Sequence, residues 1–102
     1  MLTSHELLLK YYHDRRFNFP AVSVWYVDRG APGDESCVSG DRIVRLDPYY
    51  LEVVSPRGLT EIPYHRILRI LYEGRLTWDR SVRTRTKGID PGSNKQQKIL
   101  ID

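Results

Sequence analysis

The stretch TEIPYHRILRILYEGRLTWDR, residues 60–80, decides the fold that we expect. Pro63 has no backbone N–H to donate to a neighbouring strand, so residues 63–66 are predicted to form a single helical or 3₁₀ turn that interrupts a sheet. After this turn apolar side chains alternate, Glu73-Gly74 supplies a second turn, and the alternation resumes, through Leu68, Ile70, Tyr72, Leu76 and Trp78. The pattern predicts a β-hairpin that the chain enters through a rigid turn.

The N-terminal segment predicts a helix followed by a central strand. Thr3 and Glu6 fit a capping box, and leucine–tyrosine pairs four residues apart form one apolar stripe, so a helix is expected over residues 4–15. The segment AVSVWYV, residues 21–27, is β-branched and aromatic at successive positions. This composition predicts a central strand that is covered on both faces.

The middle of the chain predicts a loop and then a β-meander. Residues 28–41 are rich in glycine and acidic residues and read as a loop, with a short edge strand near Cys37 and Val38. Within the loop, Pro32 and Gly33 occupy the positions that a type II turn favours. Two strands, RIVRLD and YYLEVV, follow, and a tight connection at Asp47-Pro48 joins them.

Together these elements predict an α+β fold. We expect one N-terminal helix packed on a strongly bent antiparallel sheet of about five strands, which forms a partial barrel. No internal repeat is evident in the sequence. Residues 1–80 are expected to form a single globular domain, and residues 81–102 a basic tail that is disordered or extended, although SVRTRT could lengthen the last strand.

Composition narrows the class of protein. The chain has 102 residues and one cysteine, Cys37, so it has no intrachain disulfide, and no spacing of Cys and His resembles a zinc site. No apolar run approaches the roughly 20 residues that span a bilayer, and we expect neither secretion nor membrane insertion. A cytoplasmic protein without a metal or cofactor is the expectation.

The positive charge is concentrated near the C-terminus. Residues 1–79 hold ten Lys or Arg against eleven Asp or Glu. Residues 80–102 hold only two acidic residues against six basic ones, which are Arg80, Arg83, Arg85, Lys87, Lys95 and Lys98. A basic arm favours a polyanion such as RNA or DNA, because Lys and Arg that neutralise phosphates release counterions. The alternative is a tail that only increases solubility.

The histidines do not suggest a two-histidine enzyme. His5 and His13 lie eight residues apart on the predicted helix, or about 12 Å along its axis, so they cannot share one proton. No nucleophile elbow, phosphate-binding P-loop or paired-carboxylate motif is present. His65 differs because Tyr64 and Arg66 flank it on the predicted turn. These three side chains would leave a rigid segment in different directions, although local hydrogen bonds that hold the turn are an equally simple explanation.

A second candidate site is the loop RGAPGD, residues 29–34. Gly30 and Gly33 allow backbone N–H groups to point into one concavity, which suits an anion, and Arg29 adds a guanidinium. Asp34 could accept a hydrogen bond from a ribose hydroxyl or hold Arg29 in place. The alternative is a plain turn between strands. The tryptophans could stack on bases, but Trp25 is expected in the core, whereas the pattern leaves Trp78 open.

The order of the motifs DRGAPGD, GDRIVRL, EIPYHRILRI and GRLTW resembles a small, mainly archaeal family, the RNA cyclic group end recognition domain. The resemblance covers residues 2–80. It implies binding of RNA ends that carry a 2',3'-cyclic phosphate, next to RNA-processing or repair machinery. It maps the binding site onto Arg29, Gly30, Gly33, Asp34, Tyr64, His65 and Arg66. Family members often have His before the RGA triplet, whereas this chain has Asp28.

The sequence thus favours a non-catalytic module that binds RNA ends. In this reading Arg29 and Arg66 bind phosphate, Tyr64 stacks on the terminal base, His65 donates a hydrogen bond to phosphate or ribose, and the basic tail holds the adjoining backbone. One alternative is an enzyme that acts on a cyclic or terminal phosphate, with His65 as acid or base and an aspartate, Asp34 or Asp28, as its partner. The other alternative is a protein-interaction domain of an RNA-processing assembly.

Overall fold

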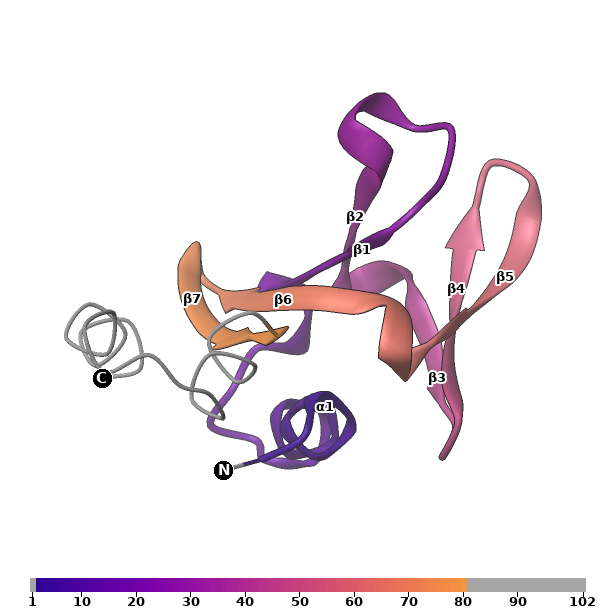
Figure 1. Cartoon of the computed structure of the whole chain (residues 1–102). Coiled ribbons are helices and arrows are strands. Elements are labelled where there is room, and N and C mark those ends of the chain that lie inside the picture. The colour runs from indigo at the N-terminus through magenta and orange to yellow at the C-terminus, as the bar shows by residue number, and fades with distance from the viewer. Residues whose placement is uncertain (1, 81–102) are drawn as a thin grey trace, which may run out of the picture.

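The computed structural model describes residues 2–80, which form one helix and seven strands (Figure 1). Helix α1 spans Ser4–His13. The Thr3 hydroxyl accepts a hydrogen bond from the Glu6 N–H at 3.1 Å, and the Glu6 carboxylate accepts one from the Thr3 N–H at 2.9 Å. The predicted capping box is therefore confirmed, and the helix ends two residues earlier than expected.

The seven strands form two antiparallel sheets. The first sheet has the order β2-β1-β6-β7, with bounds Glu35–Ser39, Val22–Val27, Ile67–Tyr72 and Arg75–Asp79. The second has the order β3-β4-β5, with bounds Ile43–Leu46, Tyr50–Ser55 and Gly58–Pro63. The predicted edge strand near Cys37 is β2, and the predicted β-meander is confirmed.

The α+β class is confirmed, but the single bent sheet of about five strands is wrong. Residues 2–80 form a four-stranded and a three-stranded sheet, and no closed barrel. Strand β5 escapes prediction because only one of its six residues, Ile62, is buried, so it carries no alternating apolar signal.

Two short 3₁₀ turns carry the chain from one sheet to the other. Turn η3, Gly40–Arg42, joins β2 to β3, and turn η4, Tyr64–Arg66, joins β5 to β6. The second is the turn predicted at residues 63–66. In both, the N–H of the following isoleucine, Ile43 or Ile67, donates to the carbonyl of the first turn residue, and that isoleucine is buried.

These two turns reveal a similarity that the sequence alone did not suggest. Each begins an Arg-Ile-aliphatic-Arg-aliphatic pattern, RIVRL at residues 42–46 and RILRI at residues 66–70. A match of five residues carries no weight by itself. The two copies nevertheless have the same structural role. In each, the arginine ends the 3₁₀ turn and the isoleucine that follows is buried in the core.

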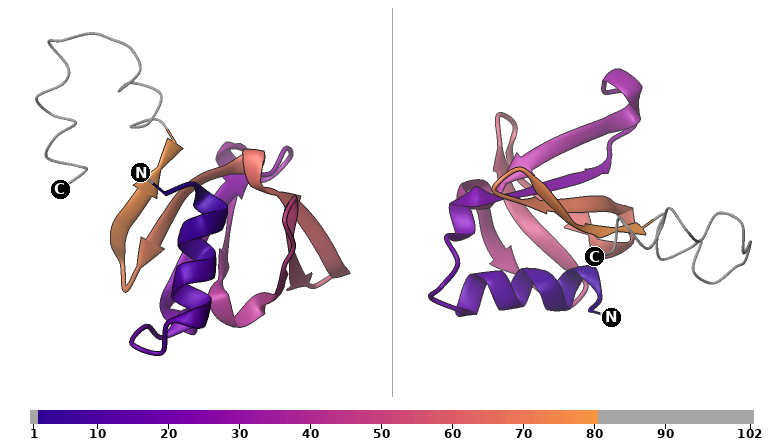
Figure 2. Two further views of the ribbon diagram at one scale, coloured as in Figure 1. Left: turned by 90° about the horizontal axis from the view of Figure 1, so that it is seen from below. Right: turned by 90° about the vertical axis from the view of Figure 1, so that its left-hand side faces the viewer.

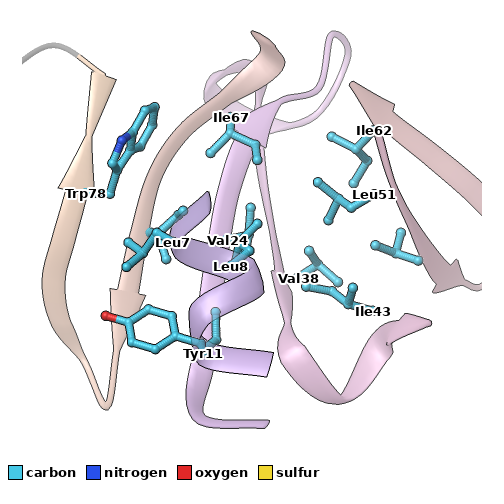
Figure 3. Packing of buried hydrophobic residues seen from close by; sticks show 13 residues of the cluster. Leu7, Leu8, Tyr11, Val24, Val38, Ile43, Leu51, Ile62, Ile67 and Trp78 are labelled. Atoms are coloured by element: carbon cyan, nitrogen blue, oxygen red, sulfur yellow. The ribbon is translucent and has the colours of Figure 1, made fainter. Parts of the chain in front are cut away.

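The core lies between α1 and the inner faces of the two sheets (Figures 2 and 3). Leu7, Leu8 and Tyr11 face it from the helix. The strands contribute the remaining buried side chains, which are Val22, Val24, Val38, Ile43, Leu51, Val53, Ile62, Ile67, Ile70 and Trp78. Burial of these side chains is the main force that holds the sheets together.

The central strand β1 is covered on one face only, which corrects two expectations. Val22 and Val24 are fully buried, whereas Ser23 and Trp25 point to the other face and are half-buried. Trp25 packs there against the Arg69 guanidinium, 5.1 Å from the ring centre, and is not a core residue. Trp78 takes the core position instead, and its indole N–H donates to the Leu2 carbonyl at 3.1 Å.

Strand β6 does not alternate as predicted, because it contains a bulge. Trp25 pairs with Arg69 but Tyr26 pairs with Ile67, so Leu68 is an extra residue in β6. The buried residues are consequently Ile67 and Ile70, three positions apart.

The remaining expectations concern residues 81–102 and a membrane-spanning helix. The proposed tail and the extension of the last strand by SVRTRT lie outside the described residues. Within residues 2–80, no helix has the length and apolar character that a transmembrane span requires.

Candidate functional site

Two hairpins project away from α1 and flank a cleft. One consists of β1 and β2, the other of β4 and β5, and they diverge from the region where the sheets meet (Figure 1). A cleft of about 670 Å³ lies between them, lined by residues of both hairpins and of both 3₁₀ turns. The site thus lies where the two sheets separate, which a single continuous sheet would not create.

The β1–β2 loop, residues 28–34, is closed by its own hydrogen bonds. The Asp28 N–H donates to the Asp34 carbonyl at 2.8 Å, and the Ala31 N–H donates to the Asp28 carbonyl at 3.1 Å. The Asp34 N–H donates to the Ala31 carbonyl at 2.8 Å, and Gly33 has φ 69° and ψ 9°, as the predicted type II turn requires. The Asp34 carboxylate accepts from the Gly30 N–H at 3.1 Å.

These hydrogen bonds change the role that the loop can have in binding an anion. Gly30, Ala31 and Asp34 each use their N–H group inside the loop, so these three donors do not form the expected concavity for an anion. Asp34 acts as a brace for the loop. The positive charge that the loop offers to a ligand comes from the Arg29 side chain, which is exposed and lines the cleft.

Asp28, the residue that replaces the histidine expected from the resemblance, is fixed in the cleft wall. Its carboxylate accepts a hydrogen bond from the Ser36 hydroxyl at 2.6 Å. Burial, with a smaller contribution from the Asp28 charge, raises the pKa of Tyr26, which also lines the cleft. Tyr26 is thus a neutral lining residue of the cleft at physiological pH, as any tyrosine with an ordinary or raised pKa would be.

The three polar side chains of η4 leave the turn in different directions, as expected. Arg66 is exposed and lines the cleft. Tyr64 turns toward α1 and stacks on His5, with ring centres 4.5 Å apart. His65 has an exposed side chain, and its backbone carbonyl accepts a hydrogen bond from the Arg80 guanidinium.

Tyr64 packs on the inner side of the turn, against the core. Its hydroxyl is buried and has no hydrogen-bond partner within residues 2–80. Burial, together with the Asp47 charge, raises the pKa of Tyr64 to about 12. Because its ring already packs on His5 and the core, its contribution is to the position of η4 and not to the lining of the cleft.

The structure brings together some of the predicted site residues. Arg29, Gly30 and Arg66 line one cleft, although Arg29 and Arg66 are 37 positions apart in the sequence. Gly33 and Asp34 shape the same loop without lining the cleft, as do Tyr64 and His65 for the turn. Of the predicted tail residues, Arg83, Arg85 and Lys87 lie outside the described residues.

Sequence reasoning missed two further arginines of the cleft. Arg42 ends turn η3, and Arg57 lies in the turn between β4 and β5. Both are exposed and line the cleft. The shared pattern RIVRL and RILRI was the one signal that could have related Arg42 to Arg66.

The four cleft arginines, as we call Arg29, Arg42, Arg57 and Arg66, give the site its charge. They outnumber the carboxylates that line the cleft, Asp28 and Glu61, by four to two. None of their guanidinium groups forms a hydrogen bond or an ion pair with another residue of the described part, 2–80. An arginine without a partner keeps its full set of donors for a carboxylate or phosphate ligand.

Three arginines elsewhere in the domain, in contrast, form ion pairs. Arg16 bonds to Asp14 at 2.7 Å, Arg45 to Asp47 at 3.3 Å, and Arg69 to Glu35 at 2.6 Å. Six arginines of residues 2–80 have no such hydrogen-bond or ion-pair partner, and four of them line the cleft, whereas Arg15 and Arg75 do not. Over residues 2–80, His, Cys, Asp and Glu side chains do not gather in any group of three that could hold a metal ion.

Comparison with known proteins gives one match. Residues 1–80 match the family described as the MJ1316 RNA cyclic group end recognition domain. No curated protein and no solved structure matches the chain. The match spans every described element, from α1 to β7, and includes both hairpins of the cleft. The chain therefore belongs to the MJ1316 RNA cyclic group end recognition domain family.

Proposed function

We propose that this protein is a non-catalytic RNA-binding module that recognises RNA ends with a 2',3'-cyclic phosphate. One observation carries the proposal: arginines from the two motif segments, Arg29 and Arg66, line the same cleft and have no partner among residues 2–80. The name of the family describes recognition of such ends. The cleft supplies donors of the kind that phosphate requires.

The chemistry of the ligand fits the charge of the cleft. A 2',3'-cyclic phosphate is a diester with a single negative charge, and the guanidinium forks of Arg29 and Arg66 can each offer two parallel N–H groups to its free oxygens. In this proposal Gly30 and Gly33 give the loop its shape, and Asp34 holds it. Exposed arginines in a cleft also raise the local concentration of a polyanion.

Turn η4 contributes position as well as charge. Tyr64 packs against α1 and fixes the turn, so that Arg66 faces the cleft while the exposed His65 imidazole remains next to it as a further donor to RNA. Rigid placement lowers the entropy that a bound guanidinium loses, which favours affinity.

The test is a binding titration with RNA oligonucleotides of one sequence that end in cyclic phosphate, linear phosphate or hydroxyl. We expect the tightest binding to the cyclic end. Arg29→Ala and Arg66→Ala should each weaken it roughly tenfold to a hundredfold, because a hydrogen bond to a charged group contributes about 1.5–3 kcal/mol. The matched control is Arg75→Ala on β7, an exposed arginine that does not line the cleft. Equal affinity for all three ends would refute end recognition.

The same samples test catalysis. Incubation of the cyclic-ended oligonucleotide with an equimolar amount of protein should leave the end intact. Opening of the cyclic phosphate, and its loss in His65→Ala or Asp34→Ala, would instead identify an enzyme.

The basic tail enters the proposal as a sequence-independent arm that holds the adjoining RNA backbone. Removal of residues 81–102 should lower the affinity for all three oligonucleotides and reduce the dependence of affinity on salt, since fewer counterions are released. If the RNA affinity of the truncated protein depends on salt as steeply as that of the full chain, the electrostatic attraction comes from the cleft alone.

A further inference from the structure

Tyr26 is the only aromatic residue that lines the cleft in the described part of the chain, residues 2–80. Tyr64, which the sequence suggested as the partner of a base, packs against α1 instead. Tyr26 packs on the hydrophobic core but is only half-buried, so the core holds it in place while part of it remains accessible. A base that enters the cleft therefore has one aromatic ring on which to stack.

The strand register places Tyr26 beside the arginines of the proposed phosphate site. Tyr26 pairs with Ile67 on β6, the residue that directly follows Arg66, and Arg29 lies three residues after Tyr26 in the chain. On the other side of β1, Tyr26 pairs with Ser36 on β2. A nucleotide whose phosphate binds Arg29 and Arg66 can thus place its base next to Tyr26.

Asp28 supplies an oriented acceptor on the same face as Tyr26. Side chains two residues apart along a strand share a face, as do directly paired residues of neighbouring strands. The Ser36 hydroxyl, on this face, donates to Asp28 Oδ2 at 2.6 Å. Among residues 2–80, Asp28 Oδ1 has no hydrogen-bond partner, and the carboxylate forms no ion pair with a cleft arginine. The cleft therefore contains a fixed negative acceptor beside its aromatic ring.

Such an acceptor restricts the ligand. A carboxylate only accepts hydrogen bonds and repels phosphate, so it must face a donor of the ligand. The terminal ribose of a 2',3'-cyclic end has no free 2'- or 3'-hydroxyl, because both oxygens are esterified to phosphorus. The donors of the terminal nucleoside next to the phosphate are therefore those of its base.

Guanine matches a carboxylate better than the other three bases. Its Watson–Crick edge, which proteins read in single-stranded RNA, presents two adjacent donors, N1–H and the N2 amino group. In adenine and cytosine the amino group lies next to an acceptor nitrogen, and in uracil the single N–H lies between two carbonyls. Only guanine can thus offer a donor to each carboxylate oxygen.

We infer that Tyr26, Asp28 and Ser36 form a base subsite that selects guanine at the cyclic end. Tyr26 stacks on the base, the Asp28 carboxylate accepts hydrogen bonds from N1–H and the N2 amino group, and Ser36 orients that carboxylate. This inference rests on the proposed function and adds a base specificity to it. It also gives a role to Asp28, which the histidine expected from the resemblance would not fill, because a neutral imidazole has a single acceptor.

The test uses RNA oligonucleotides with a 2',3'-cyclic end that differ only in the terminal base, which is guanine, hypoxanthine, adenine, cytosine or uracil. Hypoxanthine is the matched control for guanine, because it lacks only the N2 amino group. In calorimetry with the full chain, the guanine end should bind roughly tenfold to a hundredfold more tightly than the hypoxanthine end, as expected for a hydrogen bond to a charged group. This comparison uses wild-type protein and does not depend on the folding of any variant.

Asp28→Asn tests the acceptor, since it keeps the size of the side chain and removes its charge. It should bind the guanine end roughly tenfold more weakly than wild type does. It should bind the adenine end at least as tightly, because an amide can donate to N1 of adenine and no longer repels the phosphate. A variant that weakens both ends by one factor, or that keeps the preference for guanine, would show that Asp28 does not read the base.

Tyr26→Leu tests the stacking, since it keeps an apolar side chain against the core and removes the ring. It should weaken all five ends roughly tenfold, whereas Tyr12→Leu, which alters an exposed tyrosine outside the cleft, should not. Equal affinities in these two variants would overturn the stacking.

The outcomes separate this inference from the proposed function. If wild-type protein prefers cyclic ends but binds all five terminal bases equally, the base subsite is wrong and end recognition stands. A wild-type protein that binds cyclic, linear phosphate and hydroxyl ends equally refutes the proposed function, and the base subsite falls with it.

Discussion

Gly40 is the point at which the structure makes its sharpest prediction about stability. This buried residue begins η3, the turn that places Arg42 in the cleft. A Cβ added to Gly40 would lie 2.0 Å from the Phe19 carbonyl oxygen and 2.8 Å from its carbon, in the 3₁₀ turn η1, Phe19–Ala21. Both atoms are backbone atoms, so no side-chain rotation relieves the clash. In Gly40→Ala the two turns must move apart until the closest contact reaches at least 3.0 Å.

The expected loss of stability in Gly40→Ala follows from the contact between the added Cβ and the Phe19 backbone. Overpacking of a close-packed interior costs about 1–3 kcal/mol, and a clash between two backbones belongs at the upper end of this range. Gly→Ala also lowers the conformational entropy of the unfolded chain, and this effect offsets about 0.4–1 kcal/mol of the lost stability. We therefore expect Gly40→Ala to lose about 2–3 kcal/mol, which lowers Tm by roughly 8–24 °C in a domain of this size.

Thermal and urea unfolding, followed by circular dichroism, measure this loss. The matched control is Gly74→Ala in the β6–β7 turn, where φ is +80° and a Cβ meets no atom within 4 Å. It should lose about 1 kcal/mol, the usual cost of a left-handed conformation for an alanine. Equal losses in the two variants, or a smaller loss for Gly40→Ala, would show that η1 and η3 do not pack as closely as described.

Two further substitutions test the helix and the turn. Thr3→Ala removes the hydroxyl of the capping box and should cost about 1 kcal/mol in urea unfolding. The matched control is Thr3→Ser, which keeps a capping hydroxyl and should retain most of the stability; equal losses in the two variants would contradict the cap. Tyr64→Phe tests the buried hydroxyl: because the pKa of Tyr64 is raised from 10 to about 12, the folded protein retains a proton that the unfolded chain releases, and stability falls as pH rises through this window. The urea midpoint of Tyr64→Phe should fall less between pH 10 and 12 than that of wild type, and parallel curves would show that the Tyr64 hydroxyl is not buried in solution.

The sequence by itself determined the local elements. The capping box at Thr3 and Glu6, the type II turn at Pro32-Gly33 and the 3₁₀ turn after Pro63 were all predictable, because each depends on hydrogen bonds and dihedral angles within four residues. The α+β class followed from the same local patterns. The family motifs also pointed to Arg29 and Arg66 as a pair.

Only the tertiary structure decided which faces are buried and which side chains meet. Trp25 and Trp78 have similar strand patterns, but the core takes Trp78, whose indole bonds to Leu2 at a separation of 76 residues. Long-range contacts also determine three other features, which are the division into two sheets, the bulge at Leu68 and the position of Arg42 and Arg57 in the cleft. Burial depends on contacts between residues that lie far apart in the chain. A pattern of a few neighbouring residues does not show which distant residues will pack against them.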